Sequence, residues 1–251
     1  MGVGISAFFP AYNDAPSLPS LIARTFDVLG SCTDDFEVIV VDDGSRDDTG
    51  QVLENLAKRH GPRLRVVTHS TNRGYGGALQ TGFRHATREL VFYTDGDGQY
   101  DVGELPLLLR ELKPGVGLVN GYKLRRRDPW HRIVIGKAYN RFARVLFGIR
   151  IRDIDCDFRL VRRSLVETLE LESTSGTICV ELVRKIELSG CGVAEVGVNH
   201  YPRLHGKSQF FRWRSLARTQ RQILVLHWRL VVMPMATRAS RRALCAFRLS
   251  T

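Results

Sequence analysis

Residues 201–251 contain no aspartate or glutamate, although they hold eleven lysines and arginines. Residues 1–200 carry 26 acidic and 26 basic side chains, so this C-terminal segment supplies the whole net charge of +11. A second basic run, residues 123–152, has Asp128 as its single acid. Two basic zones beside a neutral body indicate an anionic partner, such as phosphates, a lipid headgroup layer or nucleic acid.

Cysteine and long apolar runs are also scarce. The five cysteines form no C-x-x-C pair, which argues against a zinc site or a disulfide framework and fits a reducing cytosol. The longest uncharged stretch near the end, residues 230–237, has eight residues and contains Pro234, whereas a membrane-spanning helix needs ~20. Met1 to Phe9 lacks the basic and long apolar regions of a signal peptide, so we expect a cytoplasmic protein.

The first half of the chain alternates short apolar runs with amphipathic stretches. This alternation predicts an α/β fold in which right-handed crossovers build a mostly parallel sheet flanked by helices. Ligands of such sheets lie outside the carboxyl ends of the strands. We expect Pro10 to stop the first strand. The predicted strands are 5–9, 36–41, 64–68, 90–94 and 116–120, and the predicted helices are 16–29, 49–60, 75–87 and 104–112.

The pattern changes after residue 123, but no Pro- or Ser-rich linker interrupts the chain there. We therefore predict one domain over residues 1–208 and an appended basic helical tail over residues 209–251. The elements predicted in the second half are helices over 131–147 and 178–189, a polar turn with a short strand over 153–160, and a strand over 193–200.

The tail begins with a predicted amphipathic helix over residues 209–229. Trp213 and Leu224 share one helical face, whereas Arg214 and Arg221 fall on another. A basic amphipathic helix suits an anionic membrane surface. An ordinary helix packed against the domain is the alternative.

Two carboxylates one residue apart, Asp95 and Asp97, follow the predicted strand 90–94. They therefore reach the carboxyl edge of the sheet, and Gln99 comes next in the same turn. Hard oxygen ligands at this edge suit Mg²⁺ or Mn²⁺ held against a diphosphate. A metal that bridges a nucleoside diphosphate stabilises the leaving group of a sugar transfer. A D-x-D pair also occurs in solvated surface turns, so the interpretation needs support from other motifs.

Four further segments bring chemistry suited to a nucleotide sugar. Residues 10–14 offer an aromatic ring and short polar side chains for a base and a ribose, and residues 42–45 offer an acid that can accept a hydrogen bond from a base N–H. Residues 72–78 are rich in glycine and open a helix, which permits close backbone approach. Residues 203–208 lie far downstream and supply cations for a phosphate chain.

Taken in order, the motifs PAYND, VVDDGS, NRGYGGA, DGDGQ, DCDFRLVRR and RLHGKS resemble family 2 glycosyltransferases of the GT-A fold. The chain is most similar to the dolichol- and polyprenyl-phosphate sugar synthases, and the resemblance spans residues 10–208. It implies a Rossmann-like GT-A sheet and an inverting transfer of a hexose from a donor of the GDP-mannose or UDP-glucose type. The implied acceptor is a polyprenyl or dolichyl phosphate at the cytosolic membrane face, and the implied cofactor is Mg²⁺ or Mn²⁺.

The resemblance also implies roles for individual residues. Asp42 would contact the nucleobase, and Arg203 would hold the donor diphosphate. Lys123 and Arg132 occupy places where the polyprenyl-phosphate enzymes keep arginines for phosphates. The candidates for nucleotide binding are Pro10, Tyr12, Asp14, Asp42, Asp43, Asn72, Asp95 and Lys123; those for the metal are Asp95, Asp97 and Gln99; and those for catalysis are Asp97, Arg132, Asp157 and Arg203.

The acceptor is the open part of this prediction. Compared with the family it resembles, the chain has Gly136 where some members use a serine toward the acceptor phosphate, and Asp157 where a glycine is common. A phosphate acceptor is already an anion near pH 7 and needs no protein base, whereas a hydroxyl acceptor needs one. Asp155 or Asp157 is then the candidate, and a turn whose carboxylates pair with Arg152, Arg159 and Arg162 is the structural alternative. We therefore keep a second hypothesis, a GT-A glycosyltransferase that acts on a hydroxyl of a glycan or small molecule.

Two other classes of function fit less well. A nucleic-acid binder, suggested by charge alone, does not require paired acids in a neutral body, and we expect no nucleic-acid partner. A dinucleotide-binding dehydrogenase is disfavoured because residues 74–77 lack the G-x-G-x-x-G spacing. The identity of the base, the sugar and the lipid, and the oligomeric state, stay open.

Overall fold

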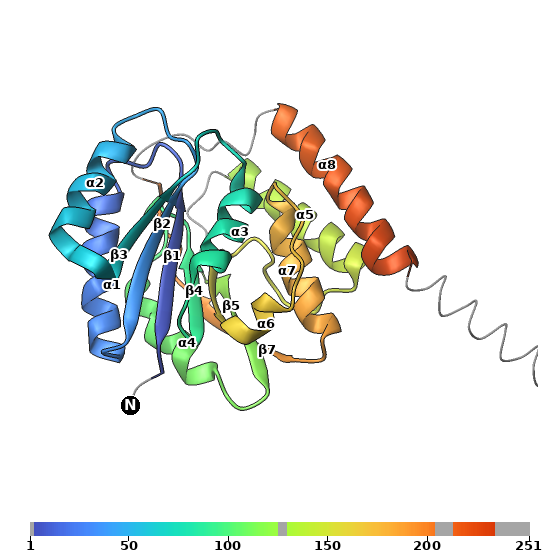
Figure 1. Ribbon diagram of the computed structural model, residues 1–251. Coiled ribbons are helices and arrows are strands. Elements are labelled where there is room, and N and C mark those ends of the chain that lie inside the picture. The colour runs from blue at the N-terminus through green and yellow to red at the C-terminus, as the bar shows by residue number, and fades with distance from the viewer. Residues whose placement is uncertain (1–2, 125–129, 204–212, 234–251) are drawn as a thin grey trace, which may run out of the picture.

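The computed structural model describes residues 3–124, 130–203 and 213–233, and a seven-stranded sheet forms the centre of this described part (Figure 1). Neighbouring strands are parallel, except that one strand near the middle is antiparallel to both of its neighbours. The strand order is β3 (Leu64–Thr68), β2 (Phe36–Asp42), β1 (Ile5–Ala11), β4 (Leu90–Thr94), the antiparallel β6 (Phe158–Arg162), β5 (Val116–Lys123) and β7 (Gly192–Val198).

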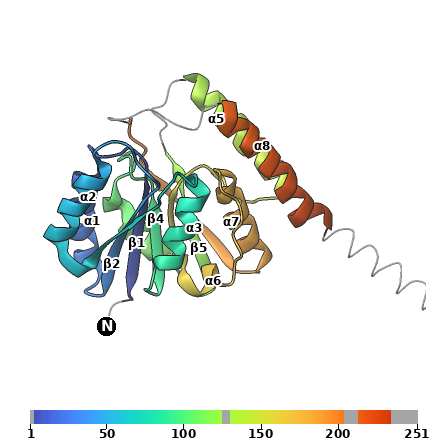
Figure 2. The same cartoon turned by 45° about the horizontal axis from the view of Figure 1, so that its top comes forward.

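Helices cover both faces of the sheet (Figures 1 and 2). One face is covered by α1 (Leu18–Cys32), α2 (Thr49–His60) and α4 (Leu105–Glu111). The other face is covered by α3 (Tyr75–His85), α5 (Trp130–Phe147), α7 (Thr177–Leu188) and α8 (Trp213–His227), and the short α6 (Arg163–Glu167) follows β6. α8 continues as a π-helical turn, Trp228–Val232. None of the helices in the described ranges is long and apolar enough to cross a membrane.

The pleat of the central strands explains the two hydrophobic layers. In β1, Ile5 and Phe9 belong to the layer beneath α1, whereas Phe8 belongs to the opposite layer. The ring of Phe8 stacks on Tyr93 at 5.3 Å and meets Phe83 edge-on at 5.0 Å. A strand that is buried on both faces reads as a continuous apolar run, as expected for a parallel sheet covered by helices.

The predicted α/β architecture is confirmed, and the helix over 49–60 and the strands over 64–68 and 90–94 lie where the sequence predicts them. The prediction that Pro10 stops the first strand is wrong. β1 continues through Pro10, which pairs with Val41 of β2. Its pairing with β4 ends two residues earlier, at Phe8. Pro10 therefore has a partner strand on one side alone. Proline lacks an amide hydrogen, and this is tolerated at a position that is not paired on both sides.

The second half of the fold departs from simple crossovers. After β5 and α5 the chain returns as β6 between β4 and β5. The predicted short strand is therefore present but antiparallel, and it is followed by α6, which the periodicity does not predict. The helix predicted over 209–229 is observed from residue 213 onward, as α8 and the π-helical turn that follows it, and residues 209–212 lie outside the described residues. The tail beyond residue 233 lies outside the described residues, and the domain division at residue 208 stays a prediction.

Candidate active site

The D-x-D turn lies against the carboxyl end of β1. The amide of Gly96 donates to the carbonyl oxygen of Pro10 at 3.2 Å, and the hydroxyl of Ser17 donates to the carbonyl oxygen of Gly96 at 2.7 Å. A Cβ on Gly96 would lie 2.8 Å from the Pro10 oxygen, so this approach requires glycine. The close fit determines where Asp95 and Asp97 emerge from the sheet edge.

Both carboxylates of the turn have partners from other elements. The hydroxyl of Tyr75, at the start of α3, donates to Oδ1 of Asp95 at 2.9 Å. The amide of Gln99 donates to Oδ1 of Asp97 at 3.0 Å, and the guanidinium of Arg203 contacts Oδ2 of Asp97. The Asp97 side chain is only 4% exposed. The turn therefore presents one buried and one partly buried acid at the edge of the sheet.

The electrostatics of this cluster suit a cation. Burial raises the pKa of Asp95 well above its ordinary value, and the charges of Asp157 and Asp97 raise it further. Burial also raises the pKa of Asp97, while the charge of Arg203 opposes that rise. A divalent cation beside these acids would offset their mutual repulsion, and carboxylate oxygens are ligands that Mg²⁺ and Mn²⁺ prefer. The residues present therefore fit such a metal.

Protein groups at this site supply only part of a coordination shell. In the described part of the chain, no group of three or more His, Cys, Asp or Glu side chains is arranged to hold a metal ion. A metal held by Asp95 and Asp97 thus needs further oxygen ligands, which a diphosphate supplies. The side-chain Nε2 of Gln99 donates to the carbonyl oxygen of Tyr201 at 3.0 Å, and the assignment of Gln99 to the metal stays a prediction.

Arg203 reaches the D-x-D turn through a short antiparallel contact between distant segments. Tyr100 and His200 form an isolated β-bridge, and the amide of Tyr201 donates to the carbonyl oxygen of Gln99 at 2.8 Å. This contact brings Arg203 beside Asp97. The remainder of its predicted loop, residues 204–208, lies outside the described residues.

The two loops predicted to bind the nucleoside are clasped together. The amide of Asn13 donates to the hydroxyl of Ser45 at 3.0 Å, and the amide of Arg46 donates to Oδ1 of Asn13 at 2.8 Å. Asp42 is almost fully buried, and its Oδ1 accepts the amide of Ser45 at 2.9 Å. These contacts bring the segment after β1 beside the segment after β2, as their predicted common role requires.

Asp14 lies between this nucleoside region and the D-x-D turn. Its Oδ2 accepts the amide of Tyr12 at 3.0 Å. Burial raises the pKa of Asp14 to about 6, with a further rise from Asp97 and an opposing effect from Arg203. Asp14 therefore belongs electrostatically to the same cluster as the acids of the turn.

Asp43 has a different environment from Asp42. Its carboxylate accepts the amides of Arg73 at 2.8 Å and Gly74 at 2.9 Å, and it lies 2.6 Å from Nδ1 of His69. Asp43 thus holds the glycine-rich loop against the end of β2. Asn72, in that loop, is exposed, and its Oδ1 accepts the amide of Gly74 at 3.1 Å. Direct contact of Asp43 or Asn72 with a donor stays a prediction.

The basic residues predicted for phosphate binding are placed unequally. Nζ of Lys123 donates to the carbonyl oxygen of Asp155 at 2.7 Å, and its charge lowers the pKa of Asp97. Lys123 therefore acts on the D-x-D turn from the end of β5. Arg132 belongs to α5, but its side chain lies outside the described residues.

Asp157 pairs with Arg159, as the structural alternative to a catalytic role predicts, and it also contacts Cys179, which the sequence does not single out. Its Oδ1 accepts hydrogen bonds from Arg159 and from the thiol of Cys179, both at 3.0 Å. Arg159 is fully buried, and it also donates to Oδ1 of Asn120 at 2.6 Å and to the hydroxyl of Tyr93 at 2.5 Å. The charge of Asp157, which this network holds in place, raises the pKa of Asp95.

Sequence reasoning missed the role of Tyr75, and it named Arg159 only as an ion-pair partner of nearby acids. Tyr75 lies inside the motif NRGYGGA, but its contact with Asp95 depends on where α3 meets β4. Arg159 lies inside DCDFRLVRR, and the apolar Val161, two residues further along the same strand, is the signal that the face carrying Arg159 is also buried. Its role becomes visible only when β6 is known to lie between two other strands.

A mostly parallel sheet with an acidic turn, a clasped pair of loops and an arginine at one edge is the GT-A class of fold, as the resemblance implies. The sequence matches glycosyl transferase family 2 over residues 6–170, and the chain belongs to that family.

Four cysteines, Cys32, Cys156, Cys179 and Cys191, are free thiols in the described structure.

Curated relatives share most of this chain. An undecaprenyl-phosphate 4-deoxy-4-formamido-L-arabinose transferase from Pseudomonas paraeruginosa is 31% identical over 212 residues, which are 84% of this chain and 62% of that protein. The protein of the same name from Aeromonas hydrophila is 28% identical over 82% of this chain and 62% of its own length. The chain therefore spans about three-fifths of the length of these relatives.

Solved structures share the fold. Glucosyl-3-phosphoglycerate synthase from Mycobacterium tuberculosis, in complex with Mn²⁺, UDP and glucosyl-3-phosphoglycerate, has a TM-score of 0.68 and 21% identity, over 91% of this chain and 80% of that one. A mannosyltransferase from Pyrobaculum calidifontis, in complex with GDP-mannose and Mn²⁺, has a TM-score of 0.62 and 23% identity, over 93% of this chain and 65% of that one.

Proposed function

We propose that this protein is a metal-dependent inverting glycosyltransferase that moves a hexose from a nucleotide-diphosphate sugar to a polyprenyl phosphate. The observation that supports this most is the meeting of Asp95, Asp97 and Arg203 beside the clasped loops 10–14 and 42–46. Groups for a cation and a diphosphate thus adjoin groups for a base and a ribose. The names of the curated relatives support a polyprenyl-phosphate acceptor, and the neighbouring structures support a donor of the UDP-glucose or GDP-mannose type.

In this proposal the strand-end loops bind and orient the donor. Asp42 accepts a hydrogen bond from the base, and the Ser45 amide keeps its carboxylate in place. Pro10 and Tyr12 lie on the neighbouring segment and border the nucleoside. Asp95 and Asp97 hold Mg²⁺ or Mn²⁺, which, when bound, neutralises charge that develops on the departing diphosphate.

Arg203 and the acceptor-side cations align the reacting groups. Arg203 can turn from Asp97 toward the diphosphate, because its side chain is 29% exposed. Lys123 and Arg132 hold phosphates near the anomeric carbon. The acceptor phosphate is an anion near pH 7, so its oxygen attacks that carbon while the bond to the diphosphate breaks, with inversion and with no proton transfer to the protein.

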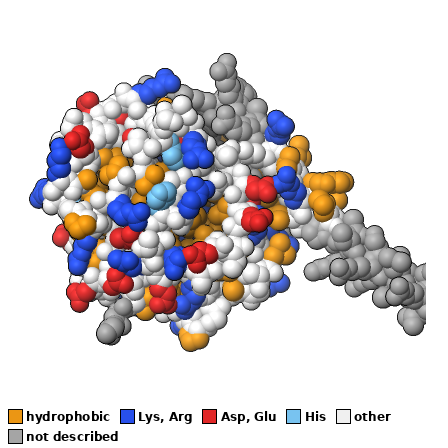
Figure 3. All heavy atoms as spheres, viewed as in Figure 1, with side chains coloured by type: hydrophobic (Ala, Val, Ile, Leu, Met, Phe, Trp, Pro, Cys, Tyr) orange, Lys and Arg blue, Asp and Glu red, His pale blue; other side chains and the backbone are white. Residues whose placement is uncertain are grey.

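Exposed apolar side chains on two helices support a membrane-surface location for this reaction. We call Val134, Phe142 and Val145 of α5, Leu224 of α8 and Trp228 of the π-helical turn after α8 the apolar patch, since each is more than half exposed. Figure 3 shows hydrophobic side chains gathered over the C-terminal part of α8.

Basic residues flank the patch on α5. Its exposed cations are Lys137, Arg141 and Arg144, which occupy a neighbouring stripe of the same helix. Apolar and basic stripes side by side suit the interface of a bilayer that contains anionic lipids. In this proposal the patch brings the site to the cytosolic surface where a lipid-linked phosphate is found.

One observation favours a hydroxyl acceptor as the second candidate. Asp157 lies close enough to Asp95 that its charge raises the pKa of that acid. A third carboxylate beside the site repels an anionic acceptor but can accept a proton from a hydroxyl. The hydrogen bonds from Arg159 and Cys179 would hold Asp157 in place for that role.

The decisive experiment is a donor screen read by thermal unfolding. UDP- and GDP-sugars are tested with Mn²⁺ and with excess chelator, using the wild type and Asp97→Asn. We expect one donor to stabilise the wild type only with metal, by about 2.7 kcal/mol at a hundredfold excess over its dissociation constant, and Asp97→Asn to lose this effect. The matched control is Asp34→Asn, because Asp34 is an exposed acid away from the sheet edge where the site lies.

Transfer assays then separate the two acceptors. Labelled sugar from the stabilising donor should appear in a lipid product that mild acid cleaves, because a glycosyl phosphate is more labile than a glycoside. An acid-stable product that disappears in Asp157→Asn would instead establish the hydroxyl acceptor. Equal stabilisation of the wild type in chelator would contradict the metal-dependent function itself.

A further inference from the structure

Residues 172–175, which precede α7, lie between α8 and the start of α3. On the α3 side, the amide of Gly76 donates to the carbonyl oxygen of Thr174 at 3.1 Å, and Nε2 of Gln80 donates to the carbonyl oxygen of Ser173 at 3.0 Å. A Cβ on Gly76 would collide with that Ser173 oxygen. The segment therefore packs directly on the first turn of the helix that also carries Tyr75.

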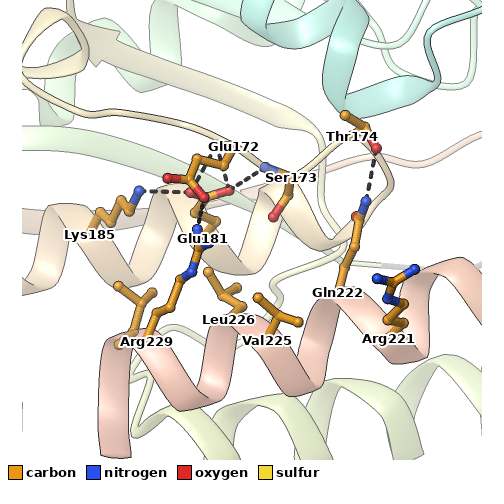
Figure 4. Close-up of a pocket in the computed structure, with 11 residues that line it drawn as sticks. Glu172, Ser173, Thr174, Glu181, Lys185, Arg221, Gln222, Val225, Leu226 and Arg229 are labelled. Atoms are coloured by element: carbon orange, nitrogen blue, oxygen red, sulfur yellow. Dashed lines mark hydrogen bonds and ion pairs between the residues drawn. The ribbon is translucent and has the colours of Figure 1, made fainter. Parts of the chain in front are cut away.

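On the other side, a single glutamine of α8 holds the same segment. Oε1 of Gln222 accepts the amide of Ser175 at 3.1 Å and its hydroxyl at 2.7 Å. Nε2 of Gln222 donates to the hydroxyl of Thr174 at 2.8 Å (Figure 4). In the π-helical turn that continues α8, Arg229 pairs with Glu172. Gln222 thus uses both ends of its amide to clamp α8 to the segment.

The upstream end of the segment is anchored to α7. Glu181 is 1% exposed, and its carboxylate accepts the amides of Glu172 at 3.0 Å and Ser173 at 2.8 Å. Nζ of Lys185 lies 2.7 Å from Oε1 of Glu181. These contacts give the buried acid a structural role in the loop.

The contact between α8 and this segment is not densely packed. A cavity of about 480 Å³ lies between them, with Glu181 on one side and Val225 and Leu226 on the other (Figure 4). Close packing supplies most of the cohesion of a protein interior. Where a cavity replaces it, the position of α8 depends more on the hydrogen bonds of Gln222 and the pair between Arg229 and Glu172.

We propose that Gln222 is a positioning residue for the metal site. By clamping residues 172–175 against Gly76, it keeps the first turn of α3 in place, so that the hydroxyl of Tyr75 stays on Oδ1 of Asp95. Release of α8 then loosens Asp95 and weakens metal binding, although Gln222 touches neither the metal nor the donor. The inference rests on the proposed metal-dependent function, and it makes the helix that bears part of the apolar patch a determinant of metal affinity.

The test measures Mn²⁺ affinity in the presence of UDP and, separately, GDP, from the electron paramagnetic resonance signal of free Mn²⁺. Gln222→Leu keeps the volume of the side chain but removes all three hydrogen bonds. We expect Mn²⁺ affinity to fall about tenfold, as at sites where a residue orients a metal ligand without touching the metal. Gln222→Glu keeps an acceptor for the amide and hydroxyl of Ser175. It also keeps the bond to Thr174 if the Thr174 hydroxyl becomes the donor. This variant should therefore retain most of the wild-type affinity for Mn²⁺.

Two controls make the result specific. Gln220→Leu is the same substitution at an exposed position of α8, two residues away, and should leave the affinity unchanged. In a Tyr75→Phe background, Gln222→Leu should have no further effect, because both changes act on the same hydrogen bond to Asp95. If Gln222→Leu unfolds the protein, Thr174→Val, which removes one bond of the clamp, replaces it.

The outcomes separate this inference from the proposed function. Unchanged Mn²⁺ affinity in folded Gln222→Leu or Thr174→Val overturns the inference, as does a full additional loss in the Tyr75→Phe background. Failure of the wild type to bind Mn²⁺ with either nucleotide overturns the proposed function instead.

Discussion

The guanidinium of Arg203 contacts Oδ2 of Asp97 across 106 residues of sequence. The contact depends on the bridge between Tyr100 and His200, which lays the segment after β7 along the segment after the D-x-D turn. In the described structure, therefore, the cation proposed for the donor diphosphate neutralises an acid proposed for the metal. When a metal and a diphosphate bind together, Asp97 would exchange Arg203 for the metal, and Arg203 would exchange Asp97 for the diphosphate.

This relationship predicts the behaviour of Arg203 variants. Arg203→Ala should lower the rate of sugar transfer by about 10²- to 10³-fold, as expected when a charge-stabilising donor is removed from a transition state. Arg203→Lys should fall between that variant and the wild type, because lysine keeps the charge but lacks the bidentate fork. The measurement is single-turnover transfer with the donor identified in the screen. A wild-type rate for Arg203→Ala would remove Arg203 from the mechanism.

Asp14 predicts a defined pH dependence of stability. Burial raises its pKa from 3.8 to about 6 in the folded protein, so the folded state binds more protons than the unfolded state between these values. The contribution of Asp14 to the free energy of unfolding is fully present below pH 3.8, where the carboxyl is protonated in both states. It is lost as the pH rises through about 6. Asp14→Asn should therefore gain stability relative to the wild type over this window, by up to about 3 kcal/mol.

Urea unfolding of both proteins at a series of pH values between 4 and 7 checks this expectation. The difference between the two free energies of unfolding cancels the groups that they share. A difference that stays constant across the window would contradict the raised pKa. We also expect Asp14→Asn to bind the nucleotide donor more weakly, because Asp14 is proposed to border the nucleoside.

Arg159 predicts a large stability effect away from the surface. Arg159→Leu removes a fully buried cation and leaves Asp157, Asn120 and Tyr93 without its hydrogen bonds. Loss of one partner from a buried charged pair costs about 3–5 kcal/mol. Arg163→Leu is the control, because its pair with Glu167 is an exposed contact within one helix, for which about 0.3–0.5 kcal/mol is expected. Similar urea midpoints for both variants would show that the buried network does not stabilise the fold.

The apolar patch predicts adsorption to anionic vesicles. Phe142→Ser and Leu224→Ser should each weaken binding to vesicles that contain phosphatidylglycerol by about tenfold, because burying a large apolar side chain stabilises by about 1.5–3 kcal/mol. Binding should also fall with added salt, because lysines and arginines flank the patch on α5. Leu107→Ser, at an exposed apolar position of α4, is the matched control. Equal sedimentation of all four proteins with vesicles would exclude the patch as a membrane surface.

The local pattern of apolar and polar residues was sufficient to predict most of the helices and strands and to place the acidic residues at one edge of the sheet. The helix over 49–60 and the strands over 64–68 and 90–94 follow from periodicity, because each buries one recognisable face or is buried on both. Parallel strands bring their carboxyl ends together whatever their order, so Asp42, Asp95 and Asp97 could be placed at one edge from the sequence alone.

The local sequence pattern could not predict which distant segments contact each other. The sequence does not reveal that β6 enters the sheet antiparallel, because a five-residue strand has the same alternation in either direction. Its place between β4 and β5 buries Arg159, which pairs with Asp157. The hydroxyl of Tyr75 on Asp95, the guanidinium of Arg203 on Asp97 and the amide of Gln222 on Thr174 likewise join segments that only packing brings together. The amino-acid sequence thus determined which chemical groups stand at the strand ends, whereas the tertiary structure decided which of them meet, since contacts between distant segments depend on the whole core.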